Sequence, residues 1–199
     1  MGEPEHDHDH DDEHDEAALR ADEEALERAA RRLIALSRIR QYGDPVLRMK
    51  GREIETFDDD LERLVGRMTS LMHEAQGVGL AATQVGVLSR LFVFVEEGED
   101  RVLVNPVITK RSKETTMDDE GCLSLREILV PVERALEVTI EGLDATGAPI
   151  SFEFEEPTSR IVQHELDHLD GVLIIDRTDA ESRRSALAKL RPQPVLGAR

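Results

Sequence analysis

Two histidines and a glutamate in the C-terminal third of the chain give its clearest chemical signal. Residues 163–171 read Gln-His-Glu-Leu-Asp-His-Leu-Asp-Gly, so His164 and His168 are four positions apart. In a helix, side chains at this spacing lie on one face, and two imidazoles placed in this way can bind one metal ion. Glu165 is then placed to act on a water activated by the metal rather than to bind the ion. The segment predicts a metal-dependent hydrolase without indicating which one.

A mononuclear catalytic site needs a third protein ligand and one open position. A thermolysin-like protease would take this ligand from a later helix, where Glu181 is the nearby candidate, and a metzincin would need a further histidine, but none follows His168. The lone cysteine, Cys122, is the better choice, because a thiolate with two imidazoles suits zinc or ferrous iron. Taken alone, Cys122 indicates only a buried small side chain, and a His-Glu-x-x-His pattern can arise by chance on a surface helix.

Two further segments have the composition of a site. Residues 77–86 read Gly-Val-Gly-Leu-Ala-Ala-Thr-Gln-Val-Gly, and their small side chains let the backbone approach a ligand closely. Residues 120–124, Glu-Gly-Cys-Leu-Ser, place the cysteine in a glycine-containing turn. His73 has no partner at ligand spacing, so we expect it to be a surface or packed histidine.

The elements that must position these residues are a mixture of helices and strands. Apolar residues at the helical period predict helices, alternating or continuous apolar runs predict strands, and turn residues separate them. The expected helices are 16–37, 58–75, 157–169 and 179–191, and the expected strands are 91–95, 102–104, 136–143, 150–154 and 172–175. Because these elements do not alternate regularly, we predict an α+β fold with small mixed or antiparallel sheets.

Composition limits the classes of protein. The 199 residues carry a net charge of −18, which disfavours broad nucleic-acid binding, and no apolar run approaches the roughly 18 residues of a membrane helix. One cysteine and no signal-type segment favour a reducing cytoplasm. Residues 1–15 alternate histidine with acidic residues, so we predict a disordered acidic tail before an N-terminal helical extension at 16–38.

The three chemical segments, in the order Gln84, Cys122, His164, resemble the peptide deformylase family. The resemblance begins with Gln41-Tyr-Gly-Asp-Pro-Val-Leu and ends with Gly171-Val-Leu-Ile-Ile-Asp-Arg. It implies a catalytic domain at 39–178 with small sheets around a central His-Glu-x-x-His helix, followed by a C-terminal helix and tail at 179–199. It also implies an amide hydrolase that removes the formyl group from the N-terminal formylmethionine of new polypeptides.

The resemblance assigns roles residue by residue. The implied metal ligands are Cys122, His164 and His168, with Fe²⁺ as the ion and Zn²⁺, Ni²⁺ or Co²⁺ as substitutes. The implied catalytic groups are Glu165 as general base and acid, and Gln84 with the backbone N–H of Leu123 as oxyanion donors. Gly79 matches the backbone that pairs with the substrate peptide, Val78 lies near the methionine pocket, and Arg134 matches an arginine that pairs with Glu120 and braces the cysteine loop.

The expected partners are formyl-Met nascent peptides and, through the basic C-terminal helix, the ribosome near its exit tunnel. No membrane partner and no direct reading of nucleic acid are expected. Two alternatives stay open: a zinc endopeptidase whose third ligand is not Cys122, and a non-enzymatic metal store that uses the histidine-rich tail.

Overall fold

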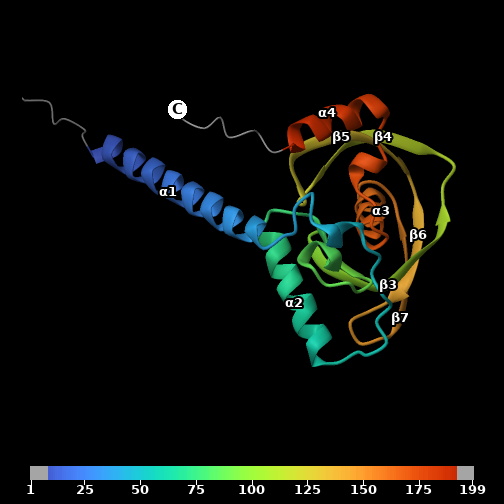
Figure 1. Cartoon of the computed structure of the whole chain (residues 1–199). Coiled ribbons are helices and arrows are strands. Elements are labelled where there is room, and N and C mark those ends of the chain that lie inside the picture. The colour runs from blue at the N-terminus through green and yellow to red at the C-terminus, as the bar shows by residue number, and fades with distance from the viewer. Residues whose placement is uncertain (1–8, 192–199) are drawn as a thin grey trace, which may run out of the picture.

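The structure is a computed structural model that describes residues 9–191, with side chains described from residue 20 onward. Helix α1 (Asp9–Ser37) projects from the rest of the molecule (Figure 1). It includes residues 9–15, for which the sequence prediction of disorder is wrong, whereas residues 1–8 of that tract lie outside the described residues. Acidic residues near a helix N-terminus interact favourably with the helix dipole, and here they precede an alanine-rich segment of high helix propensity.

The C-terminal turn of α1 is the part that packs against the body of the protein. Ala35 and Leu36 are buried, whereas Leu26 and Leu33 are 71% and 63% exposed. The apolar period that predicted this helix is therefore present, but most of its described apolar positions face solvent.

The main sheet has five antiparallel strands in the order β1-β2-β3-β6-β7. Their bounds are Gly79–Ala81, Leu91–Glu96, Glu99–Arg111, Val138–Leu143 and Pro149–Phe154. The β2–β3 pair and the β6–β7 hairpin were both predicted, because apolar runs flank their turns. Phe92 and Phe94 of β2 are fully buried and form the centre of the core with Phe154 of β7.

A second sheet, of two antiparallel strands, was not predicted. Strands β4 (Thr115–Cys122) and β5 (Leu125–Ala135) form a long hairpin that carries Cys122 at its closed end. The register shifts between Gly121 and Cys122, so the cysteine leaves the regular ladder where the hairpin turns.

Helix α3 (Thr158–Leu169) lies between the two sheets (Figure 1) and carries the His-Glu-x-x-His sequence. Val162, Leu166 and Leu169 pack against the phenylalanines of the main sheet, because they share one face of the helix. The histidines lie on the face turned toward Cys122. The predicted α+β class is confirmed, and within it α3 is the element that joins both sheets to the site.

Three further helical segments lie between α1 and β2 in the chain. Helix α2 (Asp59–Glu74) begins as predicted, with the Asp58 carboxylate accepting the backbone N–H groups of Asp60 and Leu61 at 3.0 and 3.1 Å. Short 3₁₀ helices, η1 (Pro45–Arg48) and η2 (Ala82–Val85), flank it along the chain. No helix within residues 9–191 is long and apolar enough to cross a bilayer.

The predicted strand at residues 172–175 is wrong. The chain forms a 3₁₀ helix there, η3 (Ile174–Asp176), because the Asp176 carboxylate accepts the N–H of Leu173 at 2.9 Å and closes a tight turn. The apolar side chains of this turn are buried against β5 rather than paired in a sheet. Helix α4 (Ala180–Leu190) follows at the predicted place, and the Asp179 carboxylate caps its first turn.

Candidate active site

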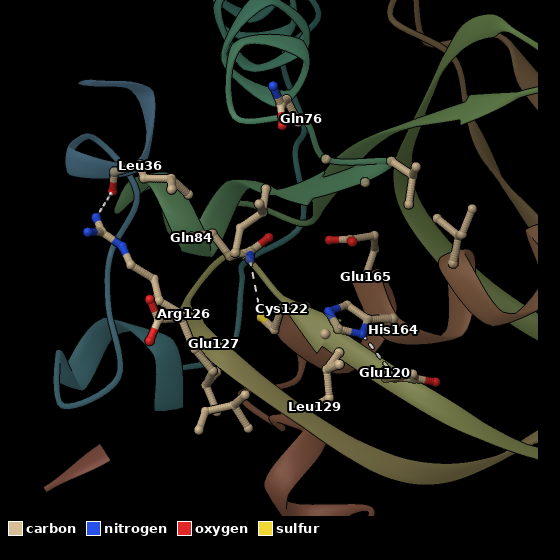
Figure 2. Close-up of a pocket in the computed structure, with 18 of the residues that line it drawn as sticks. Leu36, Gln76, Gln84, Glu120, Cys122, Arg126, Glu127, Leu129, His164 and Glu165 are labelled. Atoms are coloured by element: carbon tan, nitrogen blue, oxygen red, sulfur yellow. Dashed lines mark hydrogen bonds and ion pairs between the residues drawn. The ribbon is translucent and has the colours of Figure 1, made fainter. Parts of the chain in front are cut away.

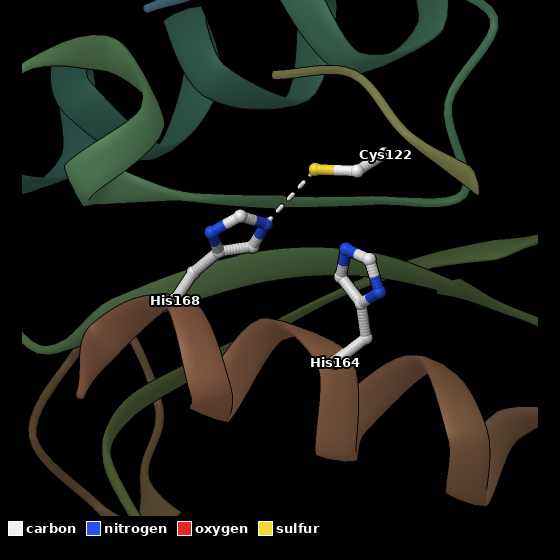
Figure 3. Close-up of side chains that lie close together, drawn as sticks. All are labelled: Cys122, His164 and His168. Carbon is white, nitrogen blue, oxygen red and sulfur yellow. Dashed lines mark hydrogen bonds between the residues drawn. The ribbon is translucent and has the colours of Figure 1, made fainter. Parts of the chain in front are cut away.

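The fold brings three potential metal ligands together. The Sγ of Cys122 and one imidazole nitrogen each of His164 and His168 all lie within 4.8 Å of one another (Figure 3). Sγ is 3.2 Å from Nε2 of His168, and the two rings lie 5.0 Å apart on successive turns of α3. One thiolate and two imidazoles are a donor set that suits zinc or ferrous iron, and three protein ligands leave one position open.

A hydrogen bond to Glu120 sets the orientation of the His164 ring. Its Nδ1–H donates to Oε2 of Glu120 at 3.0 Å, which leaves Nε2 free to bind a metal ion. Arg134 donates two hydrogen bonds to the same carboxylate, from Nε to Oε1 at 2.8 Å and from Nη2 to Oε2 at 3.0 Å. Burial alone would raise the pKa of Glu120, but its bonds to Arg134 and His164 hold that pKa at about 2. Glu120 is therefore ionised and able to fix the imidazole.

Three more charged residues join this brace, and none was singled out from the sequence. Arg160 Nη1 donates to Glu120 at 2.9 Å, while the Asp167 carboxylate accepts from Arg134 at 2.6 Å and from Arg177 Nε at 3.0 Å. Asp167 lies between the two histidines in sequence and is buried, so its ion pairs are shielded from water. The network ties α3 to both strands of the β4–β5 hairpin, which carries the cysteine.

Glu165 faces the cavity from α3. It is 4% exposed, and its Oε2 has no hydrogen-bond partner among the described residues. Burial raises the pKa of its carboxyl to about 7, so the group can both take and return a proton near neutrality. A buried carboxylate oxygen without a partner costs free energy unless another group binds it. Because Glu165 faces the cavity, we expect its Oε2 to interact with a molecule bound there.

Gly79 makes room for this carboxylate. An added Cβ at this position would lie 2.4 Å from Oε1 of Glu165, closer than any real contact. Strand β1 can therefore pass beside Glu165 only with glycine there.

Gln84, on η2, holds its amide in one orientation. Its Oε1 accepts the N–H of Ala81 at 2.8 Å, so its Nε2 turns toward the site, 3.2 Å from Oγ of Ser124 and 3.8 Å from Sγ of Cys122. The hydroxyl of Thr83 donates to the backbone carbonyl of His168 at 3.1 Å and fixes η2 to the end of α3. The amide donor is thus positioned beside the ligand group before any substrate arrives.

Most of the site residues predicted from the sequence line one cavity of about 640 Å³ (Figure 2). The residues that the sequence assigned to the site and that line this cavity are Val78, Gly79, Gln84, Glu120, Cys122, Leu123, His164 and Glu165. His168 does not line the cavity but completes the group of potential metal ligands, and Arg134 bonds to Glu120. Glu181, the alternative third ligand, lies exposed on α4 and is outside the ligand group of the described residues.

We expect Gly79→Ala to lower kcat by about 100-fold, because the new methyl group displaces the Glu165 carboxylate and a shift of about 1 Å at a reacting group has this effect. Steady-state kinetics would measure the change in kcat, and an unchanged melting temperature would show that the variant is folded. Gly66→Ala is the matched control, since a Cβ at that helical position meets nothing within 4 Å. Equal activity of the two variants would show that the carboxylate does not need its present position.

Proteins similar to this chain in sequence and in fold include peptide deformylases. The sequence profile described as polypeptide deformylase matches residues 36–184. A peptide deformylase from Acidothermus cellulolyticus is 43% identical over 164 residues, which cover 82% of this chain and 91% of the relative. The crystal structure of the Thermotoga maritima peptide deformylase matches with a TM-score of 0.70 at 42% identity, over 71% of this chain and 97% of that one. Arabidopsis thaliana peptide deformylase 1B, solved with an inhibitor, gives a TM-score of 0.72 at 42% identity, over 76% and 88%. The chain therefore belongs to the peptide deformylase family of hydrolases.

Proposed function

We propose that the chain hydrolyses the formyl group from the N-terminal formylmethionine of newly synthesised polypeptides, with one metal ion held by Cys122, His164 and His168. One observation carries this proposal. The sulfur of Cys122 and one nitrogen each of His164 and His168 lie within 4.8 Å of one another. Buried Glu165, whose Oε2 has no hydrogen-bond partner among the described residues, lines the same open cavity as Cys122 and His164. Since such substrates are made in the bacterial cytoplasm, we also propose that the enzyme works there.

The reaction separates into roles for the ion and for the side chains. When bound, a divalent ion supplies Lewis acidity, which brings the pKa of water to near neutrality. Glu165 takes a proton from the attacking water and delivers it to the amine nitrogen as the C–N bond breaks, which releases formate. Its raised pKa, about 7, suits both transfers.

Charge gathers on the formyl oxygen during the attack. The Nε2 amide of Gln84 and the backbone N–H of Leu123 are the proposed donors to this oxygen. The amide supports this role because its other end is already bonded to Ala81, so the donor needs no reorganisation during the reaction.

We expect Gln84→Leu to lower kcat by about 100-fold to 1,000-fold, since losing one oxyanion donor costs about 2.7–4 kcal/mol of barrier. Metal content should stay at the parent level, because Gln84 is not among the ligands. Ser124→Ala is the control, since it removes the hydroxyl that Gln84 meets at 3.2 Å but keeps the amide itself. A Gln84→Leu enzyme that turns over like the Ser124→Ala enzyme would reject the oxyanion role.

The cavity also suggests where the rest of the substrate lies. Gly79 is on edge strand β1, so its backbone can pair with an extended peptide beside Glu165. Val78, 58% exposed at the cavity wall, is proposed to contact the methionine side chain. Glu120 and Arg134 touch no substrate in this scheme and act by holding His164.

Fe²⁺ is the proposed native ion. The mixed sulfur and nitrogen ligands accept Zn²⁺, Ni²⁺ and Co²⁺ as well, and a thiolate donates enough charge to make any of them a milder Lewis acid. Protein purified without oxygen and analysed for metals would identify the ion, and a zinc-only product with full activity would contradict the choice of iron.

The reaction itself is tested with a pair of blocked dipeptides. Formyl-Met-Ala should release formate and free Met-Ala, while acetyl-Met-Ala should stay intact because its extra methyl group crowds the carbonyl carbon. Cleavage of the Met–Ala bond in either peptide would indicate an endopeptidase instead.

We further propose that α4 contacts the ribosome. Arg184 and Lys189 are exposed on this helix, whereas Arg183 is paired with Asp176 at 3.0 Å. Charge reversal of Arg184 and Lys189 should weaken co-sedimentation with ribosomes, because free basic side chains bind phosphate-rich surfaces. Unchanged co-sedimentation of the double variant would reject this partner.

A further inference from the structure

The end of α1 forms part of the wall of the site cavity. Arg32, Leu33 and Leu36 line the same cavity as Cys122 and Glu165. Figure 2 draws Leu36 and Arg126 at one end of the cavity and Glu165 and His164 at the other. The family profile matches from residue 36 onward, so Arg32 and Leu33 lie outside the matched residues.

This wall is anchored rather than loosely placed. Arg126 Nη2 donates to the backbone carbonyl of Leu36 at 2.7 Å, at the end of α1 where such carbonyls have no partner within the helix. Arg32 Nε donates to the carbonyl of Ala75 at 3.2 Å, which ties the previous turn to the end of α2. Ala35 and Ile39 are buried in the core beside these bonds. Leu33 therefore has a fixed position relative to the cavity.

Three large apolar side chains along the cavity wall are exposed. Leu33 is 63% exposed, Val78 58% and Leu129 68%, and all three line the cavity. Leu33 belongs to α1, Leu129 to β5, and Val78 to the segment just before β1. Large apolar side chains that are exposed and gathered around one opening mark a binding surface more often than they occur by chance. Formylmethionine has only one side chain, and Val78 is the residue proposed to contact it. Leu33 and Leu129 are therefore available to bind a different side chain.

We propose that Leu33 of α1, together with Leu129 of β5, forms an outer subsite that binds an apolar side chain of the nascent peptide beyond its formylmethionine. The proposal rests on the proposed function, because the occupant is the continuation of that substrate. The cavity is continuous from the ligand group to α1, so a peptide whose first residue lies beside Glu165 can run outward along this wall. The enzyme would thus prefer nascent chains with an apolar residue early in their sequence.

The test compares three substrates: formyl-Met-Ala, the same dipeptide extended with a leucine-rich segment, and the same dipeptide extended with a serine-rich segment. The parent enzyme should prefer the leucine-rich peptide. Leu33→Ala should lower kcat/KM for that peptide about tenfold relative to the dipeptide, because it removes about two buried CH₂ contacts. Binding of the unformylated leucine-rich peptide, followed by calorimetry, should weaken by the same factor.

Ile34→Ala is the matched control. Ile34 neighbours Leu33 in the same helix and is 56% exposed, but it does not line the cavity, so its variant should behave as the parent does. Equal effects of the two variants, or no effect of either on both readouts, would overturn the subsite. If Leu33→Ala changed the oligomeric state but not the peptide preference, Leu33 would instead contact a second copy of the chain. That result would also overturn the subsite. Failure of the proposed function is distinguishable, since the parent would then release no formate even from the dipeptide.

Discussion

Glu165→Gln is expected to lower formate release by at least about 1,000-fold while metal content stays at the parent level. Glutamine keeps the size of the side chain and its place beside Gly79, but it cannot accept the proton of the attacking water. Loss of a positioned general base typically lowers the rate by about 100-fold to 10,000-fold, and here one carboxylate serves as both base and acid. Single-turnover formate release and metal analysis of the same preparation would measure the two quantities together.

Glu127→Gln provides the control for this variant. Glu127 lines the same cavity but is exposed, and removing its charge changes the local potential without touching the reacting atoms. Turnover in the Glu127→Gln enzyme should stay within about threefold of the parent value. If the Glu165→Gln enzyme retained comparable turnover, proton transfer would have to be assigned to another group.

Cys122→Ala is expected to remove both metal and activity. The alanine leaves two imidazoles on one helix, and losing a direct ligand should weaken metal binding by more than the 10-fold to 100-fold typical of outer partners. Apparent metal affinity, measured by competition with a chelator, and formate release at saturating metal would report the loss. The folded state should persist, because Cys122 lies at the end of a hairpin that hydrogen-bonds along its whole length.

Glu181→Gln separates this account from the endopeptidase alternative. Glu181 lies exposed on α4, outside the ligand group, so its variant should keep the parent's metal affinity and turnover. The endopeptidase alternative expects the reverse, with Cys122→Ala active and Glu181→Gln inactive. Activity in Cys122→Ala at the parent's metal content would therefore refute the cysteine ligand.

Much of the fold followed from periodicity in the sequence. Asp58 and the apolar stripe of α2, the run Leu91–Val95, and the spacing of His164 and His168 all have local causes, which a sequence displays directly. Strand β4 has no such local signal in its sequence. Its Asp118, Asp119 and Glu120 have low strand propensity, and most of its side chains are exposed. Strand β5 contains Pro131, which argues against an interior strand, and the structure shows that β5 pairs with β4 alone.

The candidate site divides in the same way. The groups that touch the cavity could be named from three short segments, because each segment has its own spacing or composition. Asp167 and Arg177 could not, since one is a polar position between the two ligands and the other follows η3, and their shared role depends on Arg134, far away in sequence. The exposure of Leu33 could not be predicted from the sequence either. Apolar residues at the helical period predict a buried helix face, even where no other element packs against that face.

Formate release as a function of metal occupancy tests the central claim most directly. Protein freed of metal and reloaded with Fe²⁺ in steps without oxygen should release formate from formyl-Met-Ala in proportion to the bound ion. We expect the rate to saturate at one ion per chain, because Cys122, His164 and His168 form a single three-ligand group. A rate that does not depend on occupancy, or a fully loaded protein that releases no formate, would contradict the account.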